Sequence, residues 1–232
     1  MNDSMVLWNS ISMFSQKGMN QMKSILCYGD SNTYGYNPRN GLRYPKSIRW
    51  TARLQNLLGD EYEVIEEGCN GRTTVLGEPY EVWKMGITYL RPCLNTHKPV
   101  DYVVLMLGSN DLKDGFLAKP EQIADGVRQI VEVIIEFTKE KQRFVPTIIL
   151  VSPIEVGEGV DDSPFSFEFN HEAIAKSKAF PEYYRKVAKD YNCIFFDAAT
   201  VAGPSPEDSL HMTEEGHAAF AAEIARLIRE NN

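Results

Sequence analysis

Short apolar runs alternate with longer amphipathic stretches along this chain, and this alternation restricts its fold more than any other feature. Segments of strand length occupy residues 24–29, 62–68, 102–108, 146–153 and 193–199, and the third of them is continuously apolar. Helical spacing of apolar residues predicts helices over 48–59, 120–141, 172–190 and 213–230, with a kink or restart at Pro181. Strands that alternate with helices form a parallel sheet through right-handed crossovers. The sequence therefore predicts an α/β fold with helices on both faces of one sheet.

The size and charge of the chain limit its class and its partners. A chain of 232 residues with 43% apolar and 24% charged residues suits one globular domain. We expect this domain over residues 23–232, after a loosely ordered extension over residues 1–22. Lys plus Arg number 24 and Asp plus Glu 32, so the net charge of −8 argues against nucleic acid or an anionic membrane as partner. No stretch approaches the roughly 20 apolar residues that span a bilayer, and the first 22 residues match a signal peptide poorly.

The cysteines give no sign of a disulfide framework. Cys27, Cys69, Cys93 and Cys193 show no C-x-x-C spacing, which also predicts no zinc site. A reducing cytoplasm is the expected compartment.

Polar residues gather where the predicted strands end. The first strand runs into "GDS" at 29–31, the second into "NGR" at 70–72, and the third into "GSND" at 108–111. After the fifth strand, Asp208 precedes His211 by three residues. Ligands of parallel sheets bind beyond the carboxyl ends of the strands, so we expect these four loops to face one crevice.

The residue types in these loops are those that acyl transfer needs. The hydroxyl of Ser31 is a weak nucleophile, so an imidazole, that of His211, must take its proton during attack. A carboxylate, that of Asp208, must hold this imidazole in one tautomer. The oxyanion that forms needs preorganised donors, which the N–H groups of Ser31 and Gly71 and the amide of Asn110 are able to supply.

Each short motif is weak by itself, because such polar triplets are common in turns. All of them in this order, each at the end of a predicted parallel strand, are far less expected by chance. Arg72 adjoins the glycine turn, close to Glu66 and Glu67. We expect it to form an ion pair that braces this turn and fixes the Gly71 N–H.

The remaining histidines and two aspartates are expected to have structural roles. His97 should lie at a helix end, His171 in a polar surface loop, and His217 should be carried away by the last helix. Asp111 and Asp197 should cap the turns after the third and fifth strands.

Four blocks, "GDSNTYG", "NGRTT", "MLGSND" and "DSLH", resemble those of the SGNH (GDSL) hydrolases, and the resemblance runs from about Lys23 to the C-terminus. More narrowly, "ILCYGDSNTYGYNP" and "YLRPCLNTHKPVDYVVLMLGSNDLK" are similar to the bacterial arylesterase and acyltransferase branch. The resemblance implies a three-layer α/β/α sandwich with a five-stranded, parallel, Rossmann-like (flavodoxin-like) sheet. It implies a catalytic triad of Ser31, Asp208 and His211, with Ser31, Gly71 and Asn110 forming the oxyanion hole.

The same resemblance implies a serine esterase that hydrolyses short-chain acetyl or aryl esters through an acyl-enzyme, with acyl transfer to alcohols in some members. It implies a homo-oligomer and no metal or organic cofactor. Deacetylation of an acetylated sugar stays open as an alternative, because pocket contacts decide it. A flavodoxin-like phosphate or nucleotide module, in which "SNTYG" cradles a phosphate, is a remote alternative that leaves Asn110, Asp208 and His211 unexplained.

Two loops are expected to shape the pocket. The stretch 76–87 is short beside related proteins. The acidic and aromatic stretch 155–171 is either a lid or a solvated loop anchored by Phe165, Phe167 and Phe169.

Overall fold

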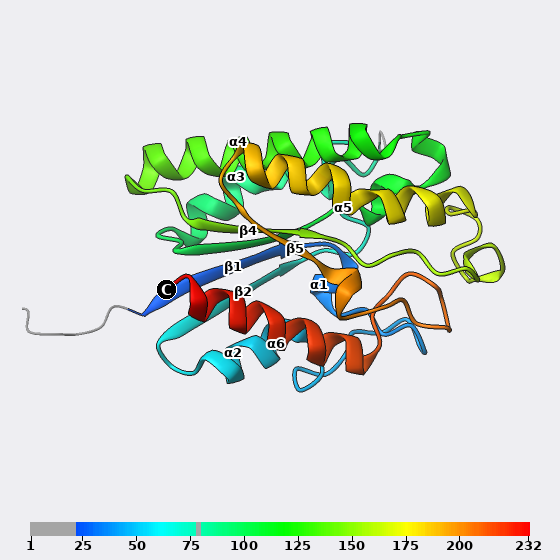
Figure 1. The fold of residues 1–232 in the computed structure, drawn as a ribbon, viewed down its shortest axis with the longest axis horizontal. Coiled ribbons are helices and arrows are strands. Elements are labelled where there is room, and N and C mark those ends of the chain that lie inside the picture. Colours follow the sequence, from blue (N-terminus) through cyan, green and yellow to red (C-terminus); the bar gives the residue numbers. More distant parts are fainter. Residues whose placement is uncertain (1–21, 78–79) are drawn as a thin grey trace, which may run out of the picture.

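The computed structural model describes residues 22–77 and 80–232, and within them one parallel sheet organises the chain (Figure 1). Its strands are β1 (Lys23–Gly29), β2 (Tyr62–Gly68), β3 (Tyr102–Met106), β4 (Thr147–Ser152) and β5 (Ile194–Asp197). They lie in the order β2-β1-β3-β4-β5, and every neighbouring pair is parallel. This is the five-stranded sheet that the sequence predicts.

Helices cover both faces of the sheet and complete the three layers (Figure 1). The α-helices are α1 (Ser31–Tyr34), α2 (Trp50–Leu58), α3 (Gly86–His97), α4 (Pro120–Gln142), α5 (Glu172–Asp190) and α6 (Glu214–Glu230). Helices α3, α4 and α5 lie above the sheet, and α2 and α6 lie below it. No helix in the described part of the chain has both the length and the apolar character needed to cross a membrane.

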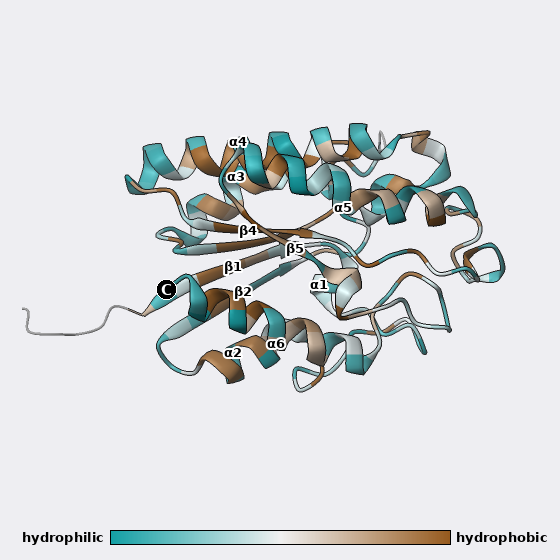
Figure 2. Cartoon of the chain, viewed as in Figure 1, coloured by the Kyte–Doolittle hydropathy of each residue, from teal (hydrophilic) through white to brown (hydrophobic). Residues whose placement is uncertain are grey.

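Each face of the sheet has its own apolar core, and strand residues alternate between the two. Leu26 and Tyr28 of β1 join the core under α3, α4 and α5, whereas Ile25 and Cys27 join the core under α2 and α6. Figure 2 shows the matching pattern, with apolar residues on the strands and on the inner sides of the helices. Each fully buried aliphatic side chain of this kind contributes about 1.5–3 kcal/mol to folding. Burial on both faces explains why β1, β3 and β4 read as nearly continuous apolar runs.

Element ends agree with the sequence prediction where a local signal exists. Thr213 is the N-cap of α6, and its side chain accepts a hydrogen bond from Gly216 N. The side chain of Asp197 accepts from Ala199 N, which ends β5 in a 3₁₀ turn as the capping role predicts. By contrast, α5 continues through Pro181 as one helix, so the predicted restart does not occur. The predicted extension over residues 1–22 lies, except for Met22, outside the described residues.

Candidate active site

The end of β1 presents a serine on a short, capped helical turn. The Asp30 side chain accepts a hydrogen bond from Asn32 N at 3.0 Å, and the Asp30 carbonyl accepts from the N–H of Tyr34 at 2.9 Å. Ser31 is therefore the first residue of α1, at the carboxyl end of the central region of the sheet. Desolvation raises the pKa of the fully buried Asp30 carboxyl to about 6, against the opposing effect of the Asn32 N–H.

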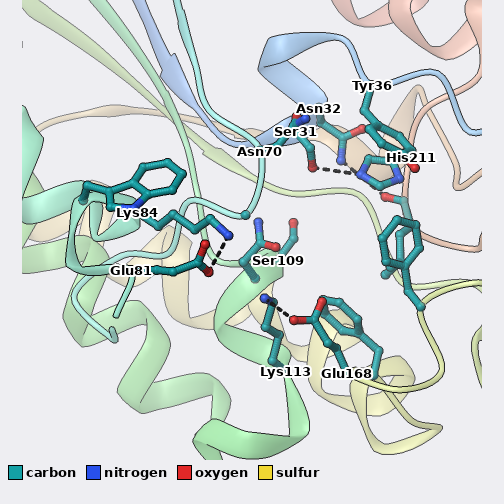
Figure 3. A pocket seen from close by; sticks show the side chains of 16 residues that line it. Ser31, Asn32, Tyr36, Asn70, Glu81, Lys84, Ser109, Lys113, Glu168 and His211 are labelled. Carbon is teal, nitrogen blue, oxygen red and sulfur yellow. Dashed lines mark hydrogen bonds and ion pairs between the residues drawn. The ribbon is translucent and has the colours of Figure 1, made fainter. Parts of the chain in front are cut away.

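The hydroxyl of Ser31 meets the imidazole of His211 in the loop between β5 and α6. Ser31 Oγ lies 2.8 Å from His211 Nε2 (Figure 3), and His211 Nδ1 lies 2.6 Å from Asp208 Oδ2. The other carboxylate oxygen of Asp208 accepts from the backbone N–H groups of Leu210 and His211, both at 3.0 Å. This geometry favours the tautomer in which Nδ1 carries the proton, so that Nε2 faces the hydroxyl as an acceptor.

Asn32 ties the serine turn to the histidine loop, and sequence reasoning missed it. Its amide donates to the Leu210 carbonyl at 3.3 Å, and its side-chain oxygen accepts from Met212 N at 2.9 Å. These two peptide groups flank His211 in the chain. The side chain next to Ser31 thus holds the backbone on both sides of the imidazole that Ser31 faces. Its place directly after the serine was the one available signal.

The predicted oxyanion donors border the same cavity as Ser31 and His211. This cavity of about 400 Å³ is lined by Ser31, Gly71, Asn110 and His211, while Asp208 lies behind the imidazole. The Asn110 amide donates to the Arg72 carbonyl at 3.1 Å, which orients the amide and leaves its second N–H for a ligand. Gly71 has φ +74°, a left-handed conformation that other residues rarely adopt. The structure brings the predicted site residues together.

Asp111 joins the loop after β2 to the loop after β3. It is fully buried and accepts hydrogen bonds from Thr74 N at 2.9 Å and from Thr74 Oγ1 at 2.5 Å. Desolvation raises its pKa to about 7, and the nearby Asp30 carboxylate adds to the rise. The prediction of a structural role holds, but the carboxylate clamps a neighbouring loop where a turn cap was expected.

Arg72 braces the ends of β1 and β2 through carbonyl groups, and the predicted ion pair is wrong. Its guanidinium donates to the carbonyl oxygens of Gly29 (3.0 Å) and Glu67, and it lies 4.3 Å from the Tyr28 ring centroid. The carboxylates of the two nearby glutamates have other partners. Glu66 pairs with Arg43 and Arg49, and Glu67 contacts His97.

The other histidines lie away from Ser31. His97 is the last residue of α3, as expected for a helix end. His171 is exposed, with Nδ1 3.7 Å from Asp161 Oδ2. His217 is buried in α6 and accepts a hydrogen bond from Trp50 N at 3.4 Å, and desolvation lowers its pKa to about 3.

Aromatic rings and charged pairs form the walls of the cavity. The rings of Tyr36 and Phe165 lie 4.2 Å and 5.5 Å from the His211 ring, centroid to centroid. Two ion pairs line the opposite wall (Figure 3), Lys84 with Glu81 at 2.5 Å and Lys113 with Glu168 at 2.6 Å. These pairs come from the stretches 76–87 and 155–171 and from the turn after β3, and sequence reasoning did not identify them.

The stretch 155–171 combines features of both predicted alternatives. Phe165 lines the cavity, and Phe169 lines it while being nearly fully buried. Phe167 is 78% exposed, so its predicted anchoring role is wrong. The stretch forms a wall of the cavity held by two of its three phenylalanines.

The comparisons with known proteins agree with this site. Residues 27–219 match the model of the GDSL-like Lipase/Acylhydrolase family. Est24, a carbohydrate acetylesterase from Sinorhizobium meliloti, is 32% identical, with 90% of this chain and 100% of that chain covered and a TM-score of 0.84. The native aryl esterase of M. smegmatis is 32% identical over 90% of this chain and 99% of that chain, with a TM-score of 0.83.

A more distant structure shows a likeness of fold alone. A member of the lipolytic protein G-D-S-L family from Veillonella parvula DSM 2008 is 16% identical over 89% of this chain and 98% of that chain, with a TM-score of 0.65. Among curated proteins no match is found. The family model covers most of the chain, and the two esterase structures align over nearly their whole length, so the resemblance predicted from four sequence blocks is confirmed: the chain belongs to the GDSL-like lipase/acylhydrolase family.

Proposed function

We propose that the protein is a serine esterase that hydrolyses short-chain acetyl or aryl esters through an acyl-enzyme. One observation carries this proposal, the unbroken hydrogen-bond chain from Asp208 through His211 to Ser31 at the edge of a cavity. We assign Ser31 as the nucleophile, His211 as the base and Asp208 as the orienting acid. Family membership supports the same chemistry.

In the first step Ser31 Oγ attacks the ester carbonyl carbon while its proton passes to His211 Nε2. The former carbonyl oxygen becomes an oxyanion, which the N–H groups of Ser31 and Gly71 and the amide of Asn110 stabilise. Asp208 stabilises the imidazolium that forms. Collapse of the intermediate breaks the bond to the alcohol oxygen, which leaves with the Nε2 proton, and the acyl group stays on Ser31.

In the second step water attacks the acyl-enzyme and gives its proton to His211 Nε2. The carboxylic acid leaves, and the proton returns to Ser31 Oγ. An alcohol in place of water yields a new ester, so acyl transfer needs no further residue. The partner of the enzyme is thus a small-molecule ester, and none of these steps needs a metal or an organic cofactor.

A carbohydrate O-acetyl ester is the second candidate substrate, and the charged wall of the cavity favours it. The Lys84–Glu81 and Lys113–Glu168 pairs offer donors and acceptors to a hydroxylated alcohol moiety opposite His211. The likeness to Est24, a carbohydrate acetylesterase, supports the same substrate class. Initial rates on nitrophenyl esters of rising acyl length and on acetylated sugars will separate the two candidates.

The phosphate-binding alternative is disfavoured by the start of α1. The Asp30 carboxylate already accepts the N–H of Asn32, where a bound phosphate would need free N–H groups and no competing acid. The helical turn is also only four residues long.

We further propose a homo-oligomer in a reducing cytoplasm, with residues 23–232 as the hydrolase domain and residues 1–22 as an appended extension. Free thiols at all four cysteines support the compartment. Exposed apolar side chains on the stretch 76–87, at Tyr80, Val82 and Trp83, support contacts between copies.

Replacement of Ser31 tests the proposed mechanism. Ser31→Ala should abolish hydrolysis of 4-nitrophenyl acetate and labelling by a fluorophosphonate, whereas Asn110→Ala should still be labelled at Ser31, more slowly, and should lose about a hundredfold or more in kcat. Mass spectrometry of the labelled wild type should find the probe on the peptide that contains Ser31. Full activity of a folded Ser31→Ala protein would refute the proposal.

A further inference from the structure

Three side chains with metal-binding atoms cluster at the edge of the sheet, away from the active-site cavity. A carboxylate oxygen of Glu67, the sulfur of Cys93 and a ring nitrogen of His97 all lie within 4.8 Å of one another. None of the three lines the cavity beside Ser31. The cluster is therefore separate from the proposed ester hydrolysis, and a proposal about it can be tested independently.

The fold brings these residues together from two elements. Cys93 and His97 are four residues apart in α3, so their side chains lie on the same face of the helix. Glu67 lies on β2, the edge strand beside β1. Strand alternation directs Glu66 to the opposite face, where it bonds Arg49, and leaves Glu67 on the α3 side.

The contact between His97 and Glu67 explains only part of the cluster. His97 Nε2 lies 2.8 Å from Glu67 Oε1, as in an ordinary hydrogen-bonded pair. This pair does not involve the thiol of Cys93, which belongs to the apolar core and whose sulfur lies within 4.8 Å of both groups. A soft sulfur, an imidazole nitrogen and a carboxylate oxygen together form a donor set that suits a borderline cation.

We propose that Glu67, Cys93 and His97 form a binding site for one divalent cation of the Zn²⁺ type, with solvent as the fourth ligand. Bond lengths of about 2.3 Å to sulfur and 2.0–2.2 Å to nitrogen and oxygen place tetrahedral ligand atoms about 3.3–3.7 Å apart. The present separations, from 2.8 Å to at most 4.8 Å, bracket this range. The separation between any two of the ligand atoms therefore needs to change by at most about 1.5 Å to reach this range.

Access and charge also suit a cation. The side chains of His97 and Glu67 are 25% and 18% exposed, so an ion reaches the site from solvent while the sulfur lies on its inner side. On binding, the sulfur–hydrogen bond of Cys93 gives way to a sulfur–metal bond, and the proton leaves to the buffer. The thiolate and the Glu67 carboxylate then balance the charge of the ion. Arg72, a neighbouring cation, is already bonded to backbone carbonyls.

The sequence predicts no zinc site because it lacks C-x-x-C spacing. A site that joins a helix to a strand 26 residues earlier has no such signature, since the fold alone brings Glu67 to the helix.

Cobalt serves as the spectroscopic probe. The full chain, treated with chelator and dialysed, is titrated with Co²⁺ under anaerobic conditions. We expect a thiolate-to-cobalt charge-transfer band in the near ultraviolet and intense visible bands of a tetrahedral ion, saturating at one ion per chain. Added Zn²⁺ should displace the cobalt and raise the melting temperature in proportion to the logarithm of its concentration.

Variants then identify the ligands. Cys93→Ala should remove the charge-transfer band, and Glu67→Gln and His97→Gln should each weaken Co²⁺ binding at least tenfold. Cys69→Ala, at a partly exposed cysteine outside the cluster, is the matched control and should leave the band unchanged. Circular dichroism verifies the fold of each variant, and the partly exposed Glu67 and His97 positions decide the question if Cys93→Ala fails to fold.

Two results would overturn the proposal. One is the absence of a charge-transfer band in the wild type at millimolar Co²⁺. The other is a band that keeps its affinity in folded Glu67→Gln and His97→Gln proteins, because the cobalt would then be bound elsewhere. Ester hydrolysis by Ser31 is measured separately on the metal-free protein, so the failure of either hypothesis is recognised without the other.

Discussion

Asn32 follows Ser31 in the chain, and its side chain contacts the backbone on both sides of His211. Its two hydrogen bonds reach the peptide groups of Leu210 and Met212, about 180 residues away. The distance between the serine hydroxyl and the imidazole depends on how this loop is held. A displacement of about 1 Å in such a contact lowers a rate about a hundredfold.

Asn32→Ala is therefore expected to lower kcat by about ten- to a hundredfold with little change in KM. The lost hydrogen bonds leave the Leu210 carbonyl and the Met212 N–H without their buried partner, which costs about 1–3 kcal/mol of stability. Fluorophosphonate labelling of Ser31 reports the geometry directly and should slow by the same factor as kcat.

Asn40→Ala serves as the control, since the Asn40 side chain bonds Leu42 N in an exposed turn. A folded Asn32→Ala protein that is labelled at the wild-type rate would show that the loop is held by other contacts.

The contact between β2 and α1 leaves no room for a side chain at the end of β2. A methyl group at Gly68, the last residue of β2, would lie 2.1 Å from Tyr34 N and 2.5 Å from the carbonyl carbon of Thr33. Both atoms belong to the backbone of the turn that carries Ser31. The position of the hydroxyl thus depends on the absence of a side chain at the end of the neighbouring strand.

Gly68→Ala should displace α1, lower stability by about 1–3 kcal/mol and reduce kcat more than the stability loss alone explains. Urea denaturation and steady-state kinetics measure the two effects. Gly203→Ala, where an added methyl group meets nothing within 4 Å, should change neither quantity. Unchanged kinetics in Gly68→Ala would mean that the turn adjusts without moving Ser31.

Asp111 couples the loops after β2 and β3 and makes stability depend on pH. Burial raises the folded-state pKa to about 7, well above the ordinary value, so the folded protein binds the proton more tightly than the unfolded chain. The resulting stabilisation is present below about pH 4 and is lost as the pH rises to about 7.

Relative to Asp111→Asn, the wild type should therefore lose about 1–3 kcal/mol of unfolding free energy between pH 5 and pH 8. Urea denaturation at the two pH values measures this difference. Asp60→Asn, at an exposed position, is the control. Parallel pH profiles of wild type and Asp111→Asn would contradict the prediction.

The strands and long helices followed from the sequence because their signals are local. The apolar run of β3 and the helical period of α4 predict those two elements without reference to the rest of the chain. Helix α3 received no predicted range, because Gly86 and Pro92 weaken its helical pattern and packing on the sheet stabilises it.

The site was predictable to the same extent. Ser31 directly follows β1 and His211 lies in the loop after β5, so the topology brings both to the carboxyl ends of the strands, where Ser31 Oγ and His211 Nε2 lie 2.8 Å apart. Asn32 and the Lys113–Glu168 pair escaped prediction, because their partners come from loops whose paths depend on tertiary packing. The catalytic roles themselves stay a prediction until the variants are measured.

At the scale of the whole molecule, the candidate site lies at the carboxyl ends of the strands. The loop 76–87 beside it carries exposed apolar side chains. Tyr80 is 96% exposed and Trp83 59% exposed, and Trp83 also borders the cavity. Large apolar side chains of this kind are stabilised when another surface covers them. A contact between copies at this loop would therefore also narrow the entrance for substrate.

We expect the mass of the protein in solution to be a multiple of 26.3 kDa. The double variant Tyr80→Ser, Trp83→Ser should shift this mass toward that of a single chain. Phe144→Ser, an exposed apolar position outside this loop, should leave the mass unchanged. Light scattering after size-exclusion chromatography measures both. A wild-type mass of one chain would remove the proposed oligomer.

The separation of 180 residues between the hydroxyl and the imidazole sets an order of events during synthesis. At about 5–20 residues per second, a ribosome delivers Ser31 about 10–40 s before His211. During that interval the emerging polypeptide displays its serine without a base beside it. On the proposed mechanism, the nascent chain therefore gains esterase activity only after His211 has been synthesised.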